Sequence, residues 1–440
     1  MLVKSSHARR CCVFAVVLAM AAAGCTKEPT PGRADAAPQA SAGTPGKPPR
    51  AVHDPPARFD AGAGVLMPQE ARSRRLTWPG GGTPVALHKQ RAYVALPDRV
   101  LAVDTANGAA TTAVTAEAEP LVKLTPNLEN GLPAPFITDG ESPLVLTTFF
   151  VHQPGVGTQA PRVFLEFTAI PTATGAAPWR LPLELPEWTK ESRSPIASSV
   201  VGASGKVAVF TLSSTQSTVS SFATTYAVDL DSHRVLWTKD LFRAAAVTGG
   251  IVTGEKWDRA DSDYSAVAGY DLATAAEKWR AEDRINLQVT PAGPHLILAT
   301  AKNKSDFRIQ YRQFLDPATG KVKRDLPDDL PGSDCAHDGA STVVCAGRGI
   351  ESYAWAVDDT SGAVRWQLPD KNAGRIAPQV TAVWHGRVYG KTADGPLALD
   401  ARTGADLPTR PGIAPYLVNE YTGLALSESD DALTAYPTNG

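Results

Sequence analysis

Two cysteines and a histidine lie close together in the C-terminal half of the chain, and these residue types could form a disulfide or bind zinc. Cys335 and Cys345 are ten positions apart, on either side of a turn at Asp338-Gly339. Two thiols that face each other across a hairpin can pair in an oxidising compartment. His337 would add a third zinc ligand, but no fourth is apparent, and two buried free thiols are the simpler alternative. We predict a Cys335–Cys345 disulfide.

Other patterns that could carry chemistry are weak. Asp258, Asp261 and Asp263 resemble the start of a calcium loop, but the glycine and the distal glutamate of an EF-hand are missing, so a solvated hairpin tip is the favoured interpretation. The segment Gly202–Lys206 is too short for a phosphate-binding loop. The sequence contains no HExxH, GxSxG or SxxK motif. We therefore predict no catalytic, metal-binding or cofactor-binding residues.

A repeated sequence element predicts the structure that positions the cysteines, the histidine and the aspartates named above. It consists of an apolar alternating stretch that ends in Asp, a short polar turn, and a second stretch that ends in Trp eight residues after the Asp, as in Tyr226–Trp237, Tyr270–Trp279 and Ala354–Trp366. Asp bonds its own backbone ahead in tight turns, and Gly later in the turn adopts positive φ. We predict that the Asp residues close hairpins and that the Trp residues pack between neighbouring units. The predicted structural residues are Asp104, Asp229, Asp271, Asp316, Asp358, Asp400, Trp78, Trp179, Trp237, Trp279 and Trp366.

The spacing of the copies indicates the fold. Two degenerate copies have Pro171 and Pro437 in the Asp position, and the central copies are 42 or 45 residues apart. Intervals of this length that hold only short strands are typical of four-stranded propeller blades. Arg74–Trp78 reads as an outer strand without a blade, and Pro415–Pro437 as a blade without an outer strand. We predict an all-β, eight-bladed β-propeller closed by pairing of this N-terminal strand with the last blade, with seven blades as the alternative.

The N-terminal region predicts export and lipid anchoring. Residues 1–24 have a positive start and a 13-residue apolar run, Cys11–Ala23, which is typical of a signal peptide. The run ends in Ala-Ala-Gly before Cys25, which resembles a bacterial lipobox, and the alternative is an ordinary signal peptide with a chance cysteine. Residues 25–72 are expected to form a lipidated Pro/Ala-rich tether, and residues 73–440 the propeller. Sec or Tat export stays open.

Composition limits the partners. The chain has 440 residues, a formal net charge of −2 and 20% charged residues. It lacks the basic stripe that nucleic-acid binding requires, so we predict no nucleic-acid partner. One ring of blades is expected to be a monomer.

The pattern A-x-D-x-x-T-G-x-x-x-W resembles the repeat of pyrroloquinoline-quinone-type propellers. It is seen in Ala227–Trp237, which lacks the Thr-Gly, and in Ala356–Trp366, where Ser361 replaces the Thr. That family includes quinoprotein alcohol dehydrogenases and outer-membrane assembly lipoproteins. The resemblance implies the fold over roughly residues 73–440 but not the function. The dehydrogenases hold their quinone with an adjacent-cysteine disulfide, and the one adjacent pair here, Cys11-Cys12, is in the signal peptide.

These features favour a membrane-anchored lipoprotein on the outer face of the cell membrane that binds protein partners without catalysis or cofactor. The alternatives are a quinoprotein dehydrogenase and a sensor that binds a small ligand in the central channel. Loops on one rim of a propeller commonly bind peptides or loops. The swollen loops of blades two and three, with Phe149, Phe150 and Trp188, are the expected contact face.

Overall fold

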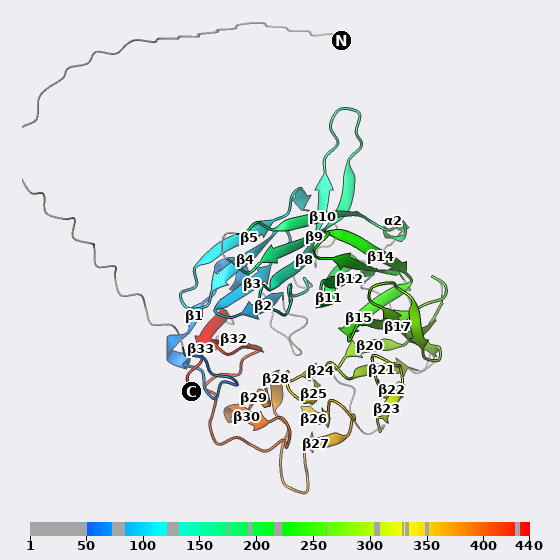
Figure 1. The fold of residues 1–440 in the computed structure, drawn as a ribbon. Coiled ribbons are helices and arrows are strands. Elements are labelled where there is room, and N and C mark those ends of the chain that lie inside the picture. Colours follow the sequence, from blue (N-terminus) through cyan, green and yellow to red (C-terminus); the bar gives the residue numbers. More distant parts are fainter. Residues whose placement is uncertain are drawn as a thin grey trace, which may run out of the picture. The chain divides into compact units, whose positions relative to one another are not determined.

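A computed structural model describes most of the chain beyond residue 50. The residues described are 51–72, 84–120, 132–173, 176–191, 196–214, 222–260, 262–302, 309–327, 330, 334–347, 352–426 and 432–440. A compact unit runs over Arg50–Gly440, so it begins earlier than the boundary at residue 73 that the sequence predicts. Figure 1 shows this unit as a ring of β-sheets.

Eight antiparallel sheets form the ring, and each is one blade. The eight-bladed prediction is therefore confirmed, including the blade of the degenerate copy at Pro171. The first four blades are built from these strands: β2 (Val85–His88), β3 (Arg91–Ala95), β4 (Arg99–Asp104) and β5 (Ala110–Thr115); β6 (Glu119–Pro120), β7 (Phe136–Ile137), β8 (Leu144–Gln153), β9 (Arg162–Pro171) and β10 (Trp179–Glu184); β11 (Ile196–Ser204), β12 (Val207–Ser214), β13 (Ala223–Asp229) and β14 (Arg234–Asp240); β15 (Phe242–Thr248), β16 (Ile251–Lys256), β17 (Tyr264–Asp271), β18 (Glu277–Arg280) and β19 (Arg284–Ile285).

The last four blades complete the ring. Their strands are β20 (Gln288–Pro291), β21 (Ile297–Lys302), β22 (Ile309–Leu315) and β23 (Val322–Asp325); β24 (Asp334–His337), β25 (Thr342–Gly347), β26 (Tyr353–Asp358) and β27 (Val364–Leu368); β28 (Gln379–Trp384), β29 (Arg387–Thr392) and β30 (Gly395–Asp400); β31 (Leu417–Val418), β32 (Thr422–Leu426), β33 (Leu433–Pro437) and β1 (Val65–Leu66). Blade seven has three strands, and beyond them only the bridge between Leu399 and Asp406 continues its outer edge.

An inner strand of each blade, the first one except in blade two, faces the centre of the ring. The strands β2, β7, β11, β15, β20, β24, β28 and β31 contact one another in a closed circle. Apolar residues on the two faces of each sheet fill the space between neighbouring blades. For example, Val344 and Ala356 of blade six pack against Val380 and Val388 of blade seven. A four-stranded sheet cannot bury both faces alone, so the ring supplies each blade with two partners.

The outer strand of the last blade differs from the predicted one. Val65 pairs with Ala435 and Leu66 with Thr434, so β1 completes blade eight beside β33. The prediction of closure by an N-terminal strand is confirmed, but the assignment of that strand to Arg74–Trp78 is wrong, and Trp78 lies outside the described residues. Two residues of strand carry no periodic pattern, and their pairing depends on contacts across the whole chain.

Residues 53–60, here called the strap, join the ring before β1 begins. Hydrogen bonds connect His53 N to Glu420 O at 3.0 Å, Phe59 N to Pro411 O at 2.8 Å and Asp60 N to Pro437 O at 2.9 Å. The Phe59 side chain is 4% exposed and packs between blades seven and eight, edge-on to Tyr389. The sequence predicts that these residues belong to the tether, whereas they form part of the wall between two blades. A short 3-10 helix, η1 (Ala61–Ala63), then leads into β1.

The ring has two faces with different loops. The turns between first and second strands and between third and fourth strands lie on one face, which we call the marker-turn face because it carries the repeated Asp turns. Hydrogen bonds tie these two sets of turns together, as from Leu230 N to Lys206 O and from Ala401 N to Gly386 O. The remaining loops lie on the opposite, long-loop face. They include the hairpin tip 154–161 and the helix α2 (Trp188–Glu191).

Candidate functional site

The repeated aspartates act in the turns of the marker-turn face. In the six copies the Oδ1 atom accepts a hydrogen bond from the backbone N–H two residues ahead, at 2.7 to 3.2 Å. In five of the six copies it also accepts from the N–H three residues ahead. Gly108, Gly320, Gly362 and Gly404 follow in the same turns at φ between 69° and 74°. These are the hairpin turns that the sequence predicts, and the hydrogen bonds of the aspartate carboxylates close them.

The repeated tryptophans link neighbouring blades. The indole N–H donates to the carbonyl that follows the aspartate of the next blade: Trp237 to Leu272 at 2.8 Å, Trp279 to Pro317 at 3.2 Å and Trp366 to Ala401 at 2.8 Å. Trp179 instead stacks on His233, with ring centroids 4.2 Å apart. These residues lie between the blades, where the sequence predicts them.

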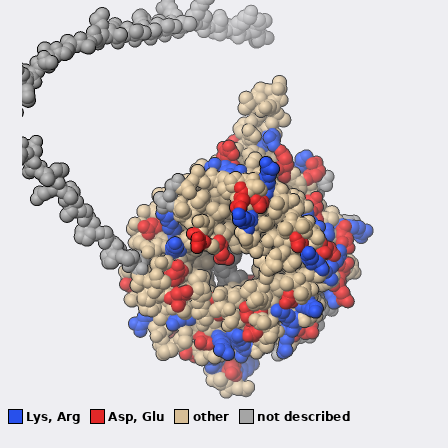
Figure 2. Space-filling model, in the orientation of Figure 1, with Lys and Arg blue, Asp and Glu red and all other residues tan. Residues whose placement is uncertain are grey.

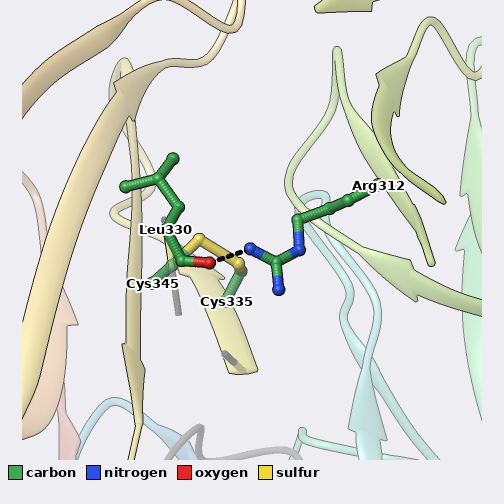
Figure 3. Close-up of a disulfide and its surroundings, with 4 residues drawn as sticks. All are labelled: Arg312, Leu330, Cys335 and Cys345. Atoms are coloured by element: carbon green, nitrogen blue, oxygen red, sulfur yellow. Dashed lines mark hydrogen bonds between the residues drawn. A yellow bond between two sulfur atoms is a disulfide. The ribbon is translucent and has the colours of Figure 1, made fainter. Parts of the chain in front are cut away.

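Cys335 and Cys345 are joined by a disulfide inside blade six (Figure 3). The two residues are directly opposite each other on β24 and β25, and they are 4% and 0% exposed. Beside them the guanidinium of Arg312 donates to the carbonyl of Leu330, as Figure 3 shows. The bond therefore crosslinks two strands within an apolar cluster.

The metal-binding alternatives have other partners. His337 Nε2 lies 3.2 Å from Asp359 Oδ2, and His337 Nδ1 accepts from Gly339 N at 3.1 Å. The carboxylate of Asp258 pairs with both terminal nitrogens of Arg280, at 2.8 and 2.9 Å, while Asp261 lies outside the described residues. Within the described residues, no group of three or more His, Cys, Asp and Glu side chains is arranged to hold a metal ion.

The long-loop face contains two neighbouring hollows over blades two to four, which we call the outer hollow and the aromatic hollow. The outer hollow has a volume of about 550 Å³ and lies between the end of β5 and the start of the 154–161 hairpin, with Glu117, Arg162 and Glu184 at its edge. The aromatic hollow has a volume of about 430 Å³ and begins at the same Glu184. Glu184 lines both, so the two hollows adjoin each other.

Side chains from three blades build the aromatic hollow. Trp188 of α2 and Phe222, just before β13, stack with ring centroids 5.8 Å apart and planes 15° from parallel. The indole N–H of Trp188 donates to Thr224 Oγ1 at 2.9 Å, and that hydroxyl donates to Asp240 Oδ1 at 2.6 Å. Tyr226 lines the same hollow. The chain of hydrogen bonds fixes the Asp240 carboxylate beside an aromatic wall.

The electrostatics of this region are acidic. Burial, together with the nearby Asp240 carboxylate, raises the pKa of Tyr226 to about 12, so its hydroxyl is neutral at ordinary pH. In the wall of blade two, Glu166 is fully buried, and its burial raises its pKa although Arg180 Nε lies 3.3 Å away. The neighbouring hairpin tip 154–161 contains no Asp, Glu, Lys or Arg. It is exposed, with Val156 74% accessible.

The sequence predicted this face only in part. Trp188 lines the aromatic hollow, whereas Phe149 is 3% exposed in the core and Phe150 packs against the cluster between blades two and three. The last two are therefore packing residues of β8, which a long apolar strand pattern could have indicated. Tyr226 and Asp240 were missed because both lie within strand patterns that predict structure, and only the fold brings them to Trp188.

No protein-family model matches the chain, and no curated protein matches it. Similar solved structures include BamB from Moraxella catarrhalis, at 14% identity and a TM-score of 0.41, covering 85% of this chain and 98% of that one. A europium-containing methanol dehydrogenase has 11% identity, a TM-score of 0.44 and coverages of 82% and 84%. The quinohemoprotein alcohol dehydrogenase from Comamonas testosteroni has 14% identity, a TM-score of 0.44 and coverages of 84% and 78%.

Both kinds of protein that the repeat resembles are thus among the similar structures. At these identities and TM-scores the likeness does not discriminate between BamB and the dehydrogenases. In the described part of the chain, no helix is long and apolar enough to cross a membrane.

Proposed function

We propose that this protein is an extracytoplasmic, lipid-anchored β-propeller that binds a protein partner on its long-loop face without catalysis. The observation that supports this most directly is the contrast between the two faces. The marker-turn face consists largely of short turns closed by their own aspartates, whereas the long-loop face has the projecting hairpin and both hollows. Loops on a rigid scaffold are where proteins most often place binding residues.

The described residues do not fit a quinone site of the dehydrogenase type. The disulfide in this part of the chain joins two positions ten residues apart and is buried between blades, away from solvent. The adjacent pair Cys11-Cys12 lies outside the described residues. Incubation with the quinone and calcium tests the alternative directly, because a stoichiometric chromophore would contradict the non-catalytic proposal.

Site-specific photocrosslinking tests the binding face. A photoreactive amino acid at Thr238 on the long-loop face, which lines the aromatic hollow, should give a discrete crosslinked partner in intact cells. The same amino acid at Arg402, exposed in a turn of the marker-turn face, is the matched control. Crosslinks from Arg402 alone, or from neither position, would contradict the assignment of the face.

The anchor is a separate part of the proposal, based on the lipobox-like sequence before Cys25, which lies outside the described residues. Replacing Cys25 with Ser removes the thiol that would be acylated. We expect the wild-type protein in the membrane fraction and the variant in the soluble extracytoplasmic fraction. Equal distribution of both proteins would show that the cysteine is not the anchor.

A further inference from the structure

The two hollows of the long-loop face have a strong charge bias. Among the described residues, four carboxylates line them and one basic residue does: Glu117, Glu184, Glu187 and Asp240 against Arg162. Arg162 pairs with Glu184, and Lys190, outside the lining, pairs with Glu187. Both pairs are largely exposed, and exposed pairs contribute little, so a bound cation can compete for these carboxylates.

Asp240 differs from the other carboxylates because its position is fixed. Thr224, fully buried, donates to Asp240 Oδ1 and accepts from the Trp188 indole. The carboxylate therefore lies at the end of a hydrogen-bonded chain, next to the stacked rings of Trp188 and Phe222. Lys256 lies nearby, but it donates to the backbone carbonyl of Asp240, at 3.5 Å.

An aromatic wall beside an ordered carboxylate is suited to a Lys or Arg side chain. The aliphatic stem packs against the rings, the cation interacts with their π faces, and the charged head pairs with the carboxylate. An acidic peptide or a phosphate would face like charges at the same place. Two adjoining hollows, which together lie over blades two to four, match an extended chain better than a single small molecule.

We propose that the outer and aromatic hollows bind a basic segment of the partner protein, with one Lys or Arg side chain seated between Trp188 and Asp240. This inference rests on the proposed binding function and specifies the chemistry of the partner. The neutral hairpin tip 154–161 borders the outer hollow, so it would contact the same segment without opposing its charge.

Fluorescence anisotropy with synthetic peptides tests the proposal on the soluble Cys25→Ser protein. The probe is a labelled peptide of about ten residues that alternates Lys with Ala, and the matched peptide has Glu in place of Lys. We expect the lysine peptide to bind and the glutamate peptide not to bind. Affinity for the lysine peptide should fall between about 0.05 and 0.5 M salt, as charge screening requires.

Variants locate the site. Asp240→Asn keeps the acceptor for Thr224 but removes the charge. The affinity for the lysine peptide should fall roughly tenfold, the loss expected for one charge-assisted contact. Asp231→Asn removes one exposed carboxylate from the marker-turn face of the same blade and should change nothing. Trp188→Leu should weaken binding at both salt concentrations. Thermal unfolding of each variant checks that the fold is intact.

The outcomes are distinct. Equal binding of the two peptides, or equal affinity of Asp240→Asn and Asp231→Asn, would overturn the basic-segment inference. If a crosslinked partner still forms at Thr238 in that case, the binding function stands and only its chemistry is wrong. If no partner crosslinks from the long-loop face, the function itself fails.

Discussion

Single oxygen atoms close the turns of this propeller. In the Asp358 turn, Oδ1 accepts from Thr360 N at 3.1 Å, from Ser361 N at 2.8 Å and from Ser361 Oγ at 2.8 Å. Arg365 pairs with the other oxygen, at 2.6 Å. The residues of this turn are therefore determined by local geometry, which is why the pattern recurs in sequence and could be recognised there.

The Asp358 turn predicts a specific pH dependence. The hydrogen bonds from Ser361, with the pairing to Arg365, lower the pKa of Asp358 to about 2. A carboxyl with a lowered folded-state pKa stabilises the fold above its unfolded value, near 3.8, and this contribution is lost as the pH falls toward 2. Because the side chain is 31% exposed, we discount the effect to about 1 kcal/mol.

Urea unfolding of Asp358→Asn measures this contribution. The variant should be less stable than the wild type at pH 7, and the difference should narrow below about pH 4. Asp394→Asn, at an exposed turn of blade seven, is the control and should show no such difference. A difference in unfolding free energy between wild type and variant that stays constant down to pH 2 would show that ionisation of Asp358 does not stabilise the turn.

Gly404 is needed for two separate reasons. Its φ is +69°, and a Cβ at this position would lie 2.7 Å from the Trp366 ring. Gly404→Ala should therefore lose about 2–4 kcal/mol of unfolding free energy, from strain plus displaced packing between blades six and seven.

Gly374 provides the matched control for Gly404. Its φ is +65°, but nothing lies within 4 Å of its would-be Cβ, so Gly374→Ala measures the backbone strain alone. We expect it to cost about 1 kcal/mol. Equal losses in the two variants would mean that contact with Trp366 is unimportant.

At the scale of elements, ring closure depends on segments that the repeat does not include. The strap and β1 supply the outer edge of blade eight and fill its boundary with blade seven. Phe59→Ala should destabilise the protein by about 3–5 kcal/mol because it empties a site that is 4% exposed. Val52→Ala, at a side chain 57% exposed, should have little effect on thermal unfolding. Similar melting temperatures for the two variants would argue against a closing role for the strap.

The disulfide belongs to one element, blade six. A chain-entropy argument gives roughly 2–3 kcal/mol for a loop this short, so replacing both Cys335 and Cys345 with Ala should lower the melting temperature modestly. The blade retains its Asp358 turn and Trp366 contact, and peptide binding should not change. Loss of peptide binding in the double variant would show that the long-loop face depends on blade six.

The sequence was informative where structure is local and uninformative where it depends on contacts distant along the chain. The Asp turns and inter-blade Trp residues were predictable because each copy repeats the same short-range chemistry. Closure of the ring by Val65–Leu66 could not be predicted, because a two-residue strand has no sequence period. In addition, Trp78 resembles the tryptophan expected at the end of an outer strand. Asp240 ends an alternating strand, and nothing in that pattern indicates Trp188, which is more than fifty positions away.

Blade seven is a second case in which the repeat pattern did not predict the strands correctly. Its copy has Asp400 and the glycine turn, so the sequence predicts a complete blade. The following segment, residues 408–415, contains three prolines. Proline cannot donate to a strand ladder, and the outer edge is reduced to the bridge at Asp406.

At the scale of the whole molecule, the turns that stabilise the ring and the hollows that we propose for binding lie on opposite faces. Figure 2 shows a hollow at its centre, with acidic and basic residues dispersed around the rim, and a projection at the top that carries neither. The aspartate turns occupy one face and the hollows the other. Changes to the long loops can therefore alter binding without affecting the turns and the indole contacts that hold the blades together.

The position of the strap has a mechanical consequence. The chain enters the ring on the marker-turn face, where Ala57 N donates to Gly440 O and Asn439 N to Arg58 O. A tensile force applied through residue 50, with the far face held by a partner, would load these bonds together with the buried Phe59 before it reached β1. The strap would thus bear the force first, and the two-residue strand that closes the ring would stay paired with β33.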